Sequence, residues 1–338
     1  MDLFSVLDLL GGLALFLFGM HTMSTSLEKV AGGKLEVYLK RMTSTPLKGL
    51  ALGTIITIII QSSSAVTVML VGFVNSGIMT LGQSVGIIMG SNIGTTLTAW
   101  ILSLGGIESE KVFINLLKPN NFSPVIALLG IILLMASSKQ KHKDIGSIFI
   151  GFAVLMYGMN NMSDAMAPLA SNEAFTKILT SFDMPLIGVL VGLIFTAIIQ
   201  SSSASVGVLQ ALAMTGQISF GMAIPIIMGQ NIGTCATALI STVGTNNNAK
   251  KVSIIHILFN VIGTIIGLCI YGIMRYVFDL TLFEESISAM NIAIVHSIFN
   301  IMTTLLLFPF SKLLVRLADI IAKDKLVDSE SFYYYSAK

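Results

Sequence analysis

The sequence has little charge. Only 11% of its 338 residues are Asp, Glu, Lys or Arg, against about 25% in a soluble domain. No charged residue occurs between Lys48 and Glu108, or between Asp183 and Lys250. Each uncharged stretch is far longer than the about 20 apolar residues that one membrane helix needs. These absences exclude a disordered chain, a nucleic-acid-binding protein and a free cytosolic enzyme, and they predict a polytopic membrane protein.

Cysteine is also scarce. Cys235 and Cys269 are the only two, and both lie in apolar segments, so no disulfide framework or zinc site can be built from them. We expect no cofactor. The alternating ten-residue strands of a membrane barrel are missing as well, and the long apolar runs therefore predict an all-α fold.

A period of 139 residues runs through the sequence. Gln-Ser-Ser-Ser-Ala at 61–65 recurs at 200–204, and Met-Gly-x-Asn-Ile-Gly-Thr at 89–95 recurs at 228–234. A shared preference for apolar residues does not place Gln, Asn and Gly in register, so the chain contains two copies of an internal repeat. We expect repeat 1 at 1–138, repeat 2 with the closing helices at 139–311, and a polar cytoplasmic tail at 312–338.

The basic residues predict that the two repeats are inverted. Lys and Arg favour the cytoplasmic side of a membrane, and they cluster at 28–48, 139–143 and 312–325. If all three clusters are cytoplasmic, the first helices of the two copies have opposite orientations. An even number of crossings must then connect the first two clusters. Because three apolar segments lie between them, at least one should be broken or re-entrant.

The serine run marks the candidate break. We expect a helix to end near Gln61, to unwind through the serines and to restart at Ala65. Free backbone N–H groups, hydroxyls and a helix N-terminus would then face one point and suit an anion, while the amide and carbonyl oxygens suit Na⁺. Small polar residues that merely pack helices would explain one such patch. Paired interrupted segments in inverted halves instead indicate a transporter's central site, at the bilayer midplane.

The missing carboxylates bear on the coupling ion. No Asp or Glu lies in 49–107 or 184–249, whereas a proton-coupled carrier usually keeps an intramembrane carboxylate. A site of neutral oxygens favours Na⁺, whose bound charge would offset that of an anion.

The doubled Gln-Ser-Ser-Ser and Gly-x-Asn-Ile-Gly-Thr motifs resemble the type II sodium–phosphate cotransporter family. Further similarity lies in 12–20, in 43–47 and in the His-x-x-Phe-Asn frames that begin at His256 and His296. The resemblance implies a multi-pass protein of the bacterial inner membrane that moves inorganic phosphate with Na⁺ by alternating access. The sequence stops without the soluble regulator-like domain that many bacterial members append, so we transfer no role for that domain.

The resemblance also implies roles for individual residues. Phosphate would be held by Ser62, Ser63, Ser64, Ser201, Ser202, Ser203, Asn92 and Asn231. Sodium would be coordinated by Gln61, Gln200, Thr95, Thr234, Thr237, Ser91 and Gln230. Gln230 departs from the small residue that is common at this position in the family, and Ser91 occupies that position in the first copy.

Other readings of the sequence remain open. The same scaffold could export phosphate or carry another oxyanion, and a channel or a membrane receptor is the alternative of a different class. His256 and His296 would suit a proton relay or, beside a serine, a protease dyad; we favour hydrogen bonds that fix the scaffold, and we expect no enzyme. The expected partners are phosphate, Na⁺ and the lipid bilayer, without nucleic acid. The sequence leaves the oligomeric state open, a homo-oligomer included.

Overall fold

The fold is all-α, as predicted. The structure, a computed structural model, describes residues 3–31, 45–106, 119–166 and 184–322. This part of the chain contains helices and one isolated bridge, between Ser219 and Ser286, but no strand. Six helical stretches in it are long and apolar enough to cross a membrane: Phe4–Ala31, Leu81–Gly106, Gln140–Met166, Phe220–Ser241, Asn247–Val277 and Ala289–Ile321. The chain is a multi-pass membrane protein.

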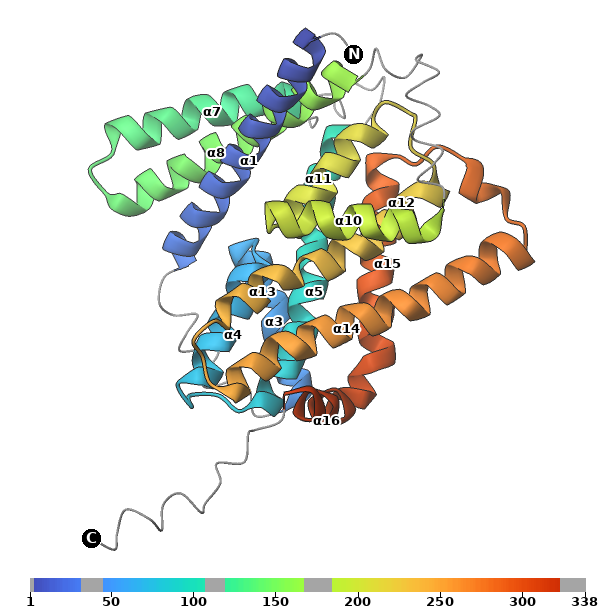
Figure 1. Ribbon diagram of the computed structural model, residues 1–338. Helices are drawn as coiled ribbons and strands as arrows, with labels where there is room; N and C mark the ends of the chain where they lie inside the picture. Colours follow the sequence, from blue (N-terminus) through green and yellow to red (C-terminus); the bar gives the residue numbers. More distant parts are fainter. Residues whose placement is uncertain (1–2, 32–44, 107–118, 167–183, 323–338) are drawn as a thin grey trace, which may run out of the picture.

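The helices follow one another in two similar series and a closing group (Figure 1). The first series is α1 (Leu3–Ala31), α3 (Pro46–Ile60), α4 (Ser63–Asn75), α5 (Leu81–Ser103) and α7 (Pro119–Ala136). The second is α8 (Gln140–Met166), α10 (Pro185–Ile199), α11 (Ser202–Ala213), α12 (Phe220–Gly233) and α13 (Cys235–Ser241). The closing group is α14 (Asn247–Gly272), α15 (Ala289–Leu307) and α16 (Ser311–Ile321).

The packing of α3 on α5 recurs in α10 on α12. A Cβ atom on Gly90 of α5 would collide with the carbonyl oxygen of Leu50, and one on Gly229 of α12 would collide with that of Val189. The two glycines and the two carbonyls are each 139 residues apart in the sequence. Pro46 and Pro185 occupy the first turn of α3 and of α10, where the missing N–H of proline has no cost.

The α3–α4 segment is a re-entrant hairpin. Gly86, Gly90 and Gly94 of α5 meet successively later residues of α3, so the two helices run parallel and α4 must lead back between them. The fifteen residues of α3 extend only about 22 Å, less than the about 30 Å of a bilayer core. The contacts of α10 with α12 make α10–α11 a second hairpin of the same kind. The expectation of a re-entrant or broken segment is confirmed.

Glycines also join α1 to α8, and the two helices are antiparallel. Gly12 of α1 lies against Gly158 of α8, and Gly19 lies against Gly151. Gly151 and Gly158 are the counterparts of Gly12 and Gly19 at the 139-residue offset. Each contact is therefore exchanged between the copies, which is the pattern of a two-fold interface.

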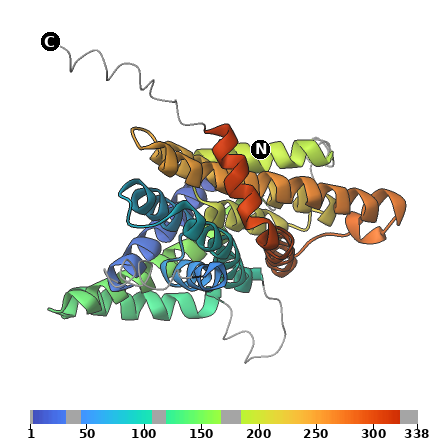
Figure 2. The same ribbon diagram turned by 90° about the horizontal axis from the view of Figure 1, so that it is seen from below.

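The expected polar tail begins with a helix. The sequence from Ser311 to Ile321 forms α16, which buries Leu314 and Ala318 and packs against α14 and α5 (Figure 2). The helix forms because these two apolar residues are four positions apart among charged ones and therefore share one face. An ion pair of 2.9 Å joins Asp319 to the buried Lys251 of α14. Residues 323–338 lie outside the described part.

Gly90→Ala tests the helix contact that positions the first hairpin. The added methyl group must separate α5 from α3, and such overpacking costs about 1–3 kcal/mol. We expect a lower melting temperature in detergent, measured by fluorescence-detected size exclusion. The control is Gly72→Ala in α4, where a Cβ atom meets nothing within 4 Å. Equal stability of the two variants would contradict the packing.

Candidate functional site

Each hairpin turns at a Gln-Ser pair. Gln61 follows α3 with φ 59° and ψ 27°, and Gln200 follows α10 with φ 61° and ψ 21°. In the described residues, Asp279 is the only other non-glycine residue with positive φ. This left-handed conformation costs about 1–2 kcal/mol for a residue with a side chain. Both tips therefore contain the same strained backbone conformation. Such local strain is often found at functional sites.

The serine after each Gln caps the returning helix. Ser62 and Ser201 have extended backbones, and their Oγ atoms accept hydrogen bonds of 3.2 Å from the N–H groups of Ala65 and Ala204. The helices therefore restart at Ser63 and Ser202, two residues earlier than the restart at Ala65 that we expected, because the first serine is a sufficient N-cap. The N–H groups of the first two residues of each helix have no acceptor within their helix.

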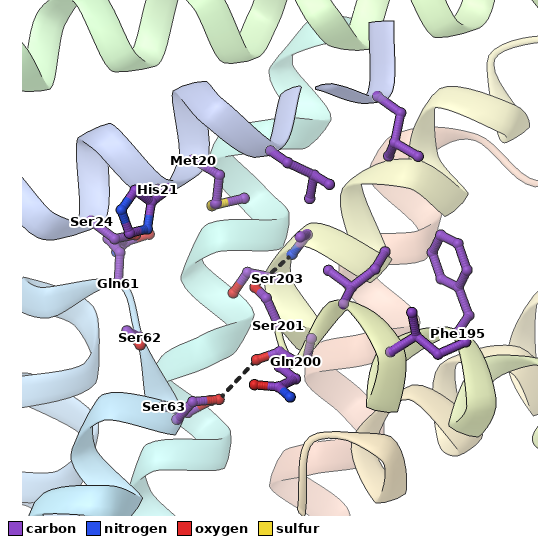
Figure 3. A pocket seen from close by; sticks show the side chains of 17 residues that line it. Met20, His21, Ser24, Gln61, Ser62, Ser63, Phe195, Gln200, Ser201 and Ser203 are labelled. Atoms are coloured by element: carbon purple, nitrogen blue, oxygen red, sulfur yellow. Dashed lines mark hydrogen bonds between the residues drawn. The ribbon is translucent and has the colours of Figure 1, made fainter. Parts of the chain in front are cut away.

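Both tips line one cavity of about 700 Å³. Figure 3 shows the two tips facing each other across it. The structure brings together here all eight residues of the two Gln-Ser-Ser-Ser motifs: Gln61, Ser62, Ser63, Ser64, Gln200, Ser201, Ser202 and Ser203. None of the described lining residues is Asp, Glu, Lys or Arg. The cavity thus offers hydroxyls, amides and two helix N-termini, each equivalent to about half a positive charge.

The two tips touch directly. The Ser64 hydroxyl donates to the Gln200 carbonyl oxygen at 3.4 Å, and Thr237 of α13 donates to the same oxygen at 3.4 Å. In the first copy, Thr98 of α5 donates to the Gln61 Oε1 atom at 2.8 Å. Thr98 is the counterpart of Thr237 at the 139-residue offset. The site residues expected from the sequence include Thr237 but not Thr98, although the repeat pairs the two threonines.

Helix α1 supplies one wall that the motifs did not reveal. Met20, His21 and Ser24 line the cavity beside Gln61 (Figure 3), together with Leu13 and Leu17. These residues share one face of α1, but nothing in the sequence shows that this face turns toward the serines. On the opposite side, Phe195 and Ile198 of α10 complete the lining.

The Asn-Ile-Gly-Thr residues lie outside the cavity lining. The side-chain nitrogens of Asn92 and Asn231 donate to the carbonyl oxygens of Ile88 and Ile227 in their own helices. The hydroxyls of Ser91, Thr95 and Thr234 likewise donate within their helices. The predicted contact of the two asparagines with phosphate finds no support in this arrangement.

The two copies differ at Gln230. Its Nε2 atom donates to the Ser205 carbonyl oxygen at 3.0 Å, while its Oε1 atom is buried and has no hydrogen-bond partner among the described residues. Ser205 in turn accepts a hydrogen bond of 2.7 Å from Thr196. The first copy has Val66 and Ser91 at the positions of Ser205 and Gln230. Gln230 and Ser205 therefore make this part of the second copy more polar than the same part of the first.

His256 and His296 do not line the cavity. Both imidazoles are buried, at 1% and 0% exposure, and no ring nitrogen has a hydrogen-bond partner among the described residues. The scaffold hydrogen bonds that we expected from the histidine side chains are therefore absent. Instead, each histidine carbonyl oxygen accepts from the asparagine one turn later, Asn260 or Asn300.

The comparison with known families gives the identity. The profile of the Na⁺/Pi-cotransporter family matches residues 15–164 and again 154–292. The chain belongs to the Na⁺/Pi-cotransporter family. This is a family of transporters, and its two matches begin 139 residues apart. No solved structure matches the chain.

Curated relatives of this cotransporter-family chain come from bacteria and mammals. The uncharacterized protein YqeW of Bacillus subtilis (strain 168) is 29% identical over 314 residues, which are 92% of this chain and 96% of YqeW. The putative inorganic phosphate export protein YjbB of Escherichia coli (strain K12) is 26% identical over 78% of this chain and 46% of YjbB. The rat sodium-dependent phosphate transport protein 2A is 28% identical over 53% of this chain and 28% of the rat protein. The chain thus spans about half of YjbB.

Thr98→Val tests the contact that fixes the first tip. The substitution leaves the Oε1 atom of the 7% exposed Gln61 without its donor, which costs about 1–3 kcal/mol. We expect a lower melting temperature than for Thr237→Val, because the Gln200 carbonyl keeps its contact with Ser64. Thr215→Val, at a turn outside the cavity, is the control. The same loss for Thr98→Val and Thr215→Val would contradict the assignment.

Proposed function

We propose that the protein is a Na⁺-coupled secondary transporter of inorganic phosphate with one central site. The observation that carries this proposal is the single neutral cavity into which both Gln-Ser-Ser-Ser tips place their hydroxyls and the start of their returning helices. Membership of the Na⁺/Pi-cotransporter family supports the substrate and the coupling ion.

In this proposal, Ser62, Ser63 and Ser64 hold phosphate together with Ser201, Ser202 and Ser203. Their hydroxyls and the backbone N–H groups of the first helical turns are donors, as phosphate oxygens require. The two helix N-termini supply about one positive charge in total. A phosphate of charge −1 to −2 needs more, and no Lys or Arg is among the described lining residues. Co-bound Na⁺ would supply the rest.

Sodium would bind to neutral oxygens at the backs of the tips. At the first tip Thr98 donates to the Oε1 atom of Gln61, and at the second Thr237 donates to the carbonyl oxygen of Gln200. The hydroxyls of Ser91, Thr95 and Thr234 donate to their own helices and keep lone pairs for a cation. Gln230 offers a buried oxygen that has no hydrogen-bond partner in the part of the chain that the structure describes. We therefore propose all of these residues as sodium ligands.

The two copies would form an inverted repeat that supports alternating access. The antiparallel α1 and α8 exchange their glycine contacts, the two hairpins have matching contacts, and the family profile matches twice with the same offset. Paired broken segments of this kind surround the substrate sites of transporters with inverted repeats. One copy would move against the other around the cavity.

In this proposal the protein lies in a bacterial inner membrane with its C-terminus in the cytoplasm, and the charges at the two ends of α14 support this orientation. Lys250 and Lys251 lie at its start, where α16 adds Lys312 and Arg316. After its far end, Arg275 stands among Asp279, Glu284 and Glu285. Basic residues favour the cytoplasmic side.

Phosphate export is a second candidate. It is favoured by the printed name of the YjbB relatives, putative inorganic phosphate export protein. The same site would serve either direction, which the ion gradients decide.

Uptake of radiolabelled phosphate into proteoliposomes tests the function. We expect uptake that depends on an inward Na⁺ gradient, and at least about a tenfold lower rate for Ser63→Ala or Ser202→Ala, equivalent to about 1.4 kcal/mol. Ser76→Ala, at the exposed end of α4, is the control and should transport normally. Absence of Na⁺-dependent uptake and of phosphate exchange by the unmodified protein would refute transport; exchange without a Na⁺ effect would refute the coupling.

Cysteine labelling tests the orientation. The Asn75–Asn246 contact places Ser76 at the end of the molecule where α14 begins, whereas Ser286 contacts Gly216 at the other end. In a Cys269→Ser background, a membrane-impermeant maleimide should modify Ser286→Cys in intact cells and Ser76→Cys only after permeabilisation. The reverse pattern would place the C-terminus outside.

A further inference from the structure

His21 is the one titratable side chain among the described residues that line the central cavity. It belongs to α1, which packs against α3, α8 and α11. Figure 3 shows its ring on the cavity side of α1, above Gln61 and next to Ser24. The side chain is exposed to the open volume and not buried in the wall.

Few other charges face His21. On its own helix, the carboxylate of Glu28, two turns further on, interacts with it electrostatically. The Gly19–Gly151 contact places residues 148–152 of α8 beside this part of α1, and they contain no titratable group. The remaining titratable groups of α8 lie toward its ends: Lys141, His142, Lys143 and Asp144 at the start, and Tyr157 and Asp164 in the later half. Helix α11 has none, and α3 has only Lys48 in its first turn.

Only the first copy of the repeat has a histidine at this position. Asn160 of α8 is the counterpart of His21 at the 139-residue offset, and it does not line the cavity. The two Gln-Ser-Ser-Ser tips are alike, so the additional charge on one wall comes from α1 alone. Because Asn160 occupies the equivalent position of α8, we expect α1 to tolerate asparagine at position 21.

We propose that the imidazolium form of His21 binds phosphate in the cavity and makes phosphate affinity depend on pH. Histidine changes its charge near neutral pH, and a positive ring beside two helix N-termini would complement a phosphate anion. Bound phosphate favours the protonated ring. Phosphate binding should therefore be stronger at acidic pH than at alkaline pH, where the contribution of a positive ring is lost. The inference rests on the proposed phosphate transport.

The test compares the phosphate KM of the unmodified protein with that of His21→Asn in proteoliposomes from about pH 8.5 to about pH 6. Both proteins meet the same mixture of phosphate ions at each pH, so the ratio of their KM values removes the titration of phosphate itself. We expect a ratio near one at the alkaline limit and a KM at least about fivefold higher for His21→Asn at the acidic limit. His142→Asn, an exposed histidine bonded to Ser137, is the control and should show no change in ratio.

His21→Lys provides the complementary variant. A permanent positive charge should retain tight phosphate binding at acidic pH and extend it to alkaline pH. His21→Gln repeats the neutral substitution should the Asn variant be poorly folded. A KM ratio that is the same at every pH would overturn the proposal and leave His21 as part of the wall.

The outcomes separate this inference from the proposed function. Loss of Na⁺-driven phosphate uptake by the unmodified protein at about pH 8.5, the alkaline limit of the test, would count against transport itself. Intact uptake with a constant ratio would count against the role of His21 alone. Thermal stabilisation of the purified proteins by inorganic phosphate, measured at both pH limits, gives the same comparison without transport.

Discussion

The left-handed turn at Gln61 and at Gln200 is the constraint on which the rest of the site depends. It ends each apolar arm inside the protein and allows the next serine, Ser62 or Ser201, to cap the returning helix. The close helix contacts at Gly90 and Gly229 hold both hairpins at a matching depth. The tips therefore meet, and a continuous helix would have left the same serines on two distant surfaces.

The chemistry of the cavity follows from what it lacks. None of its described lining residues is Asp, Glu, Lys or Arg, so apart from His21 its donors to an anion are neutral hydroxyls, amides and helix N-termini. The charge of a phosphate bound in such a site is not fully balanced until cations bind as well. This property gives a physical reason for coupling phosphate to Na⁺, and it makes the single histidine on α1 a significant local contribution.

The sequence predicted the fold well where residues repeat. The 139-residue period located both breaks and the serines that share the cavity, because polar and glycine residues recur in register. It did not reveal the wall formed by His21 and Ser24, since packing between α1 and the tips depends on long-range contacts. The amphipathic α16 lies where the sequence predicts a polar tail, because its charged residues conceal the helical spacing of Leu314 and Ala318. Asn92 and Asn231, which the resemblance assigns to phosphate, lie outside the lining of this cavity, and their amide nitrogens bond to their own helices.

The central claim is that the two tips build one phosphate site between them. Equilibrium binding of radiolabelled phosphate to the purified protein in saturating Na⁺ tests it most directly. The account predicts one phosphate per chain, and loss of that binding when either Ser63 or Ser202 alone is replaced by Ala. Two phosphates per chain, or one that persists when a single tip is altered, would contradict it.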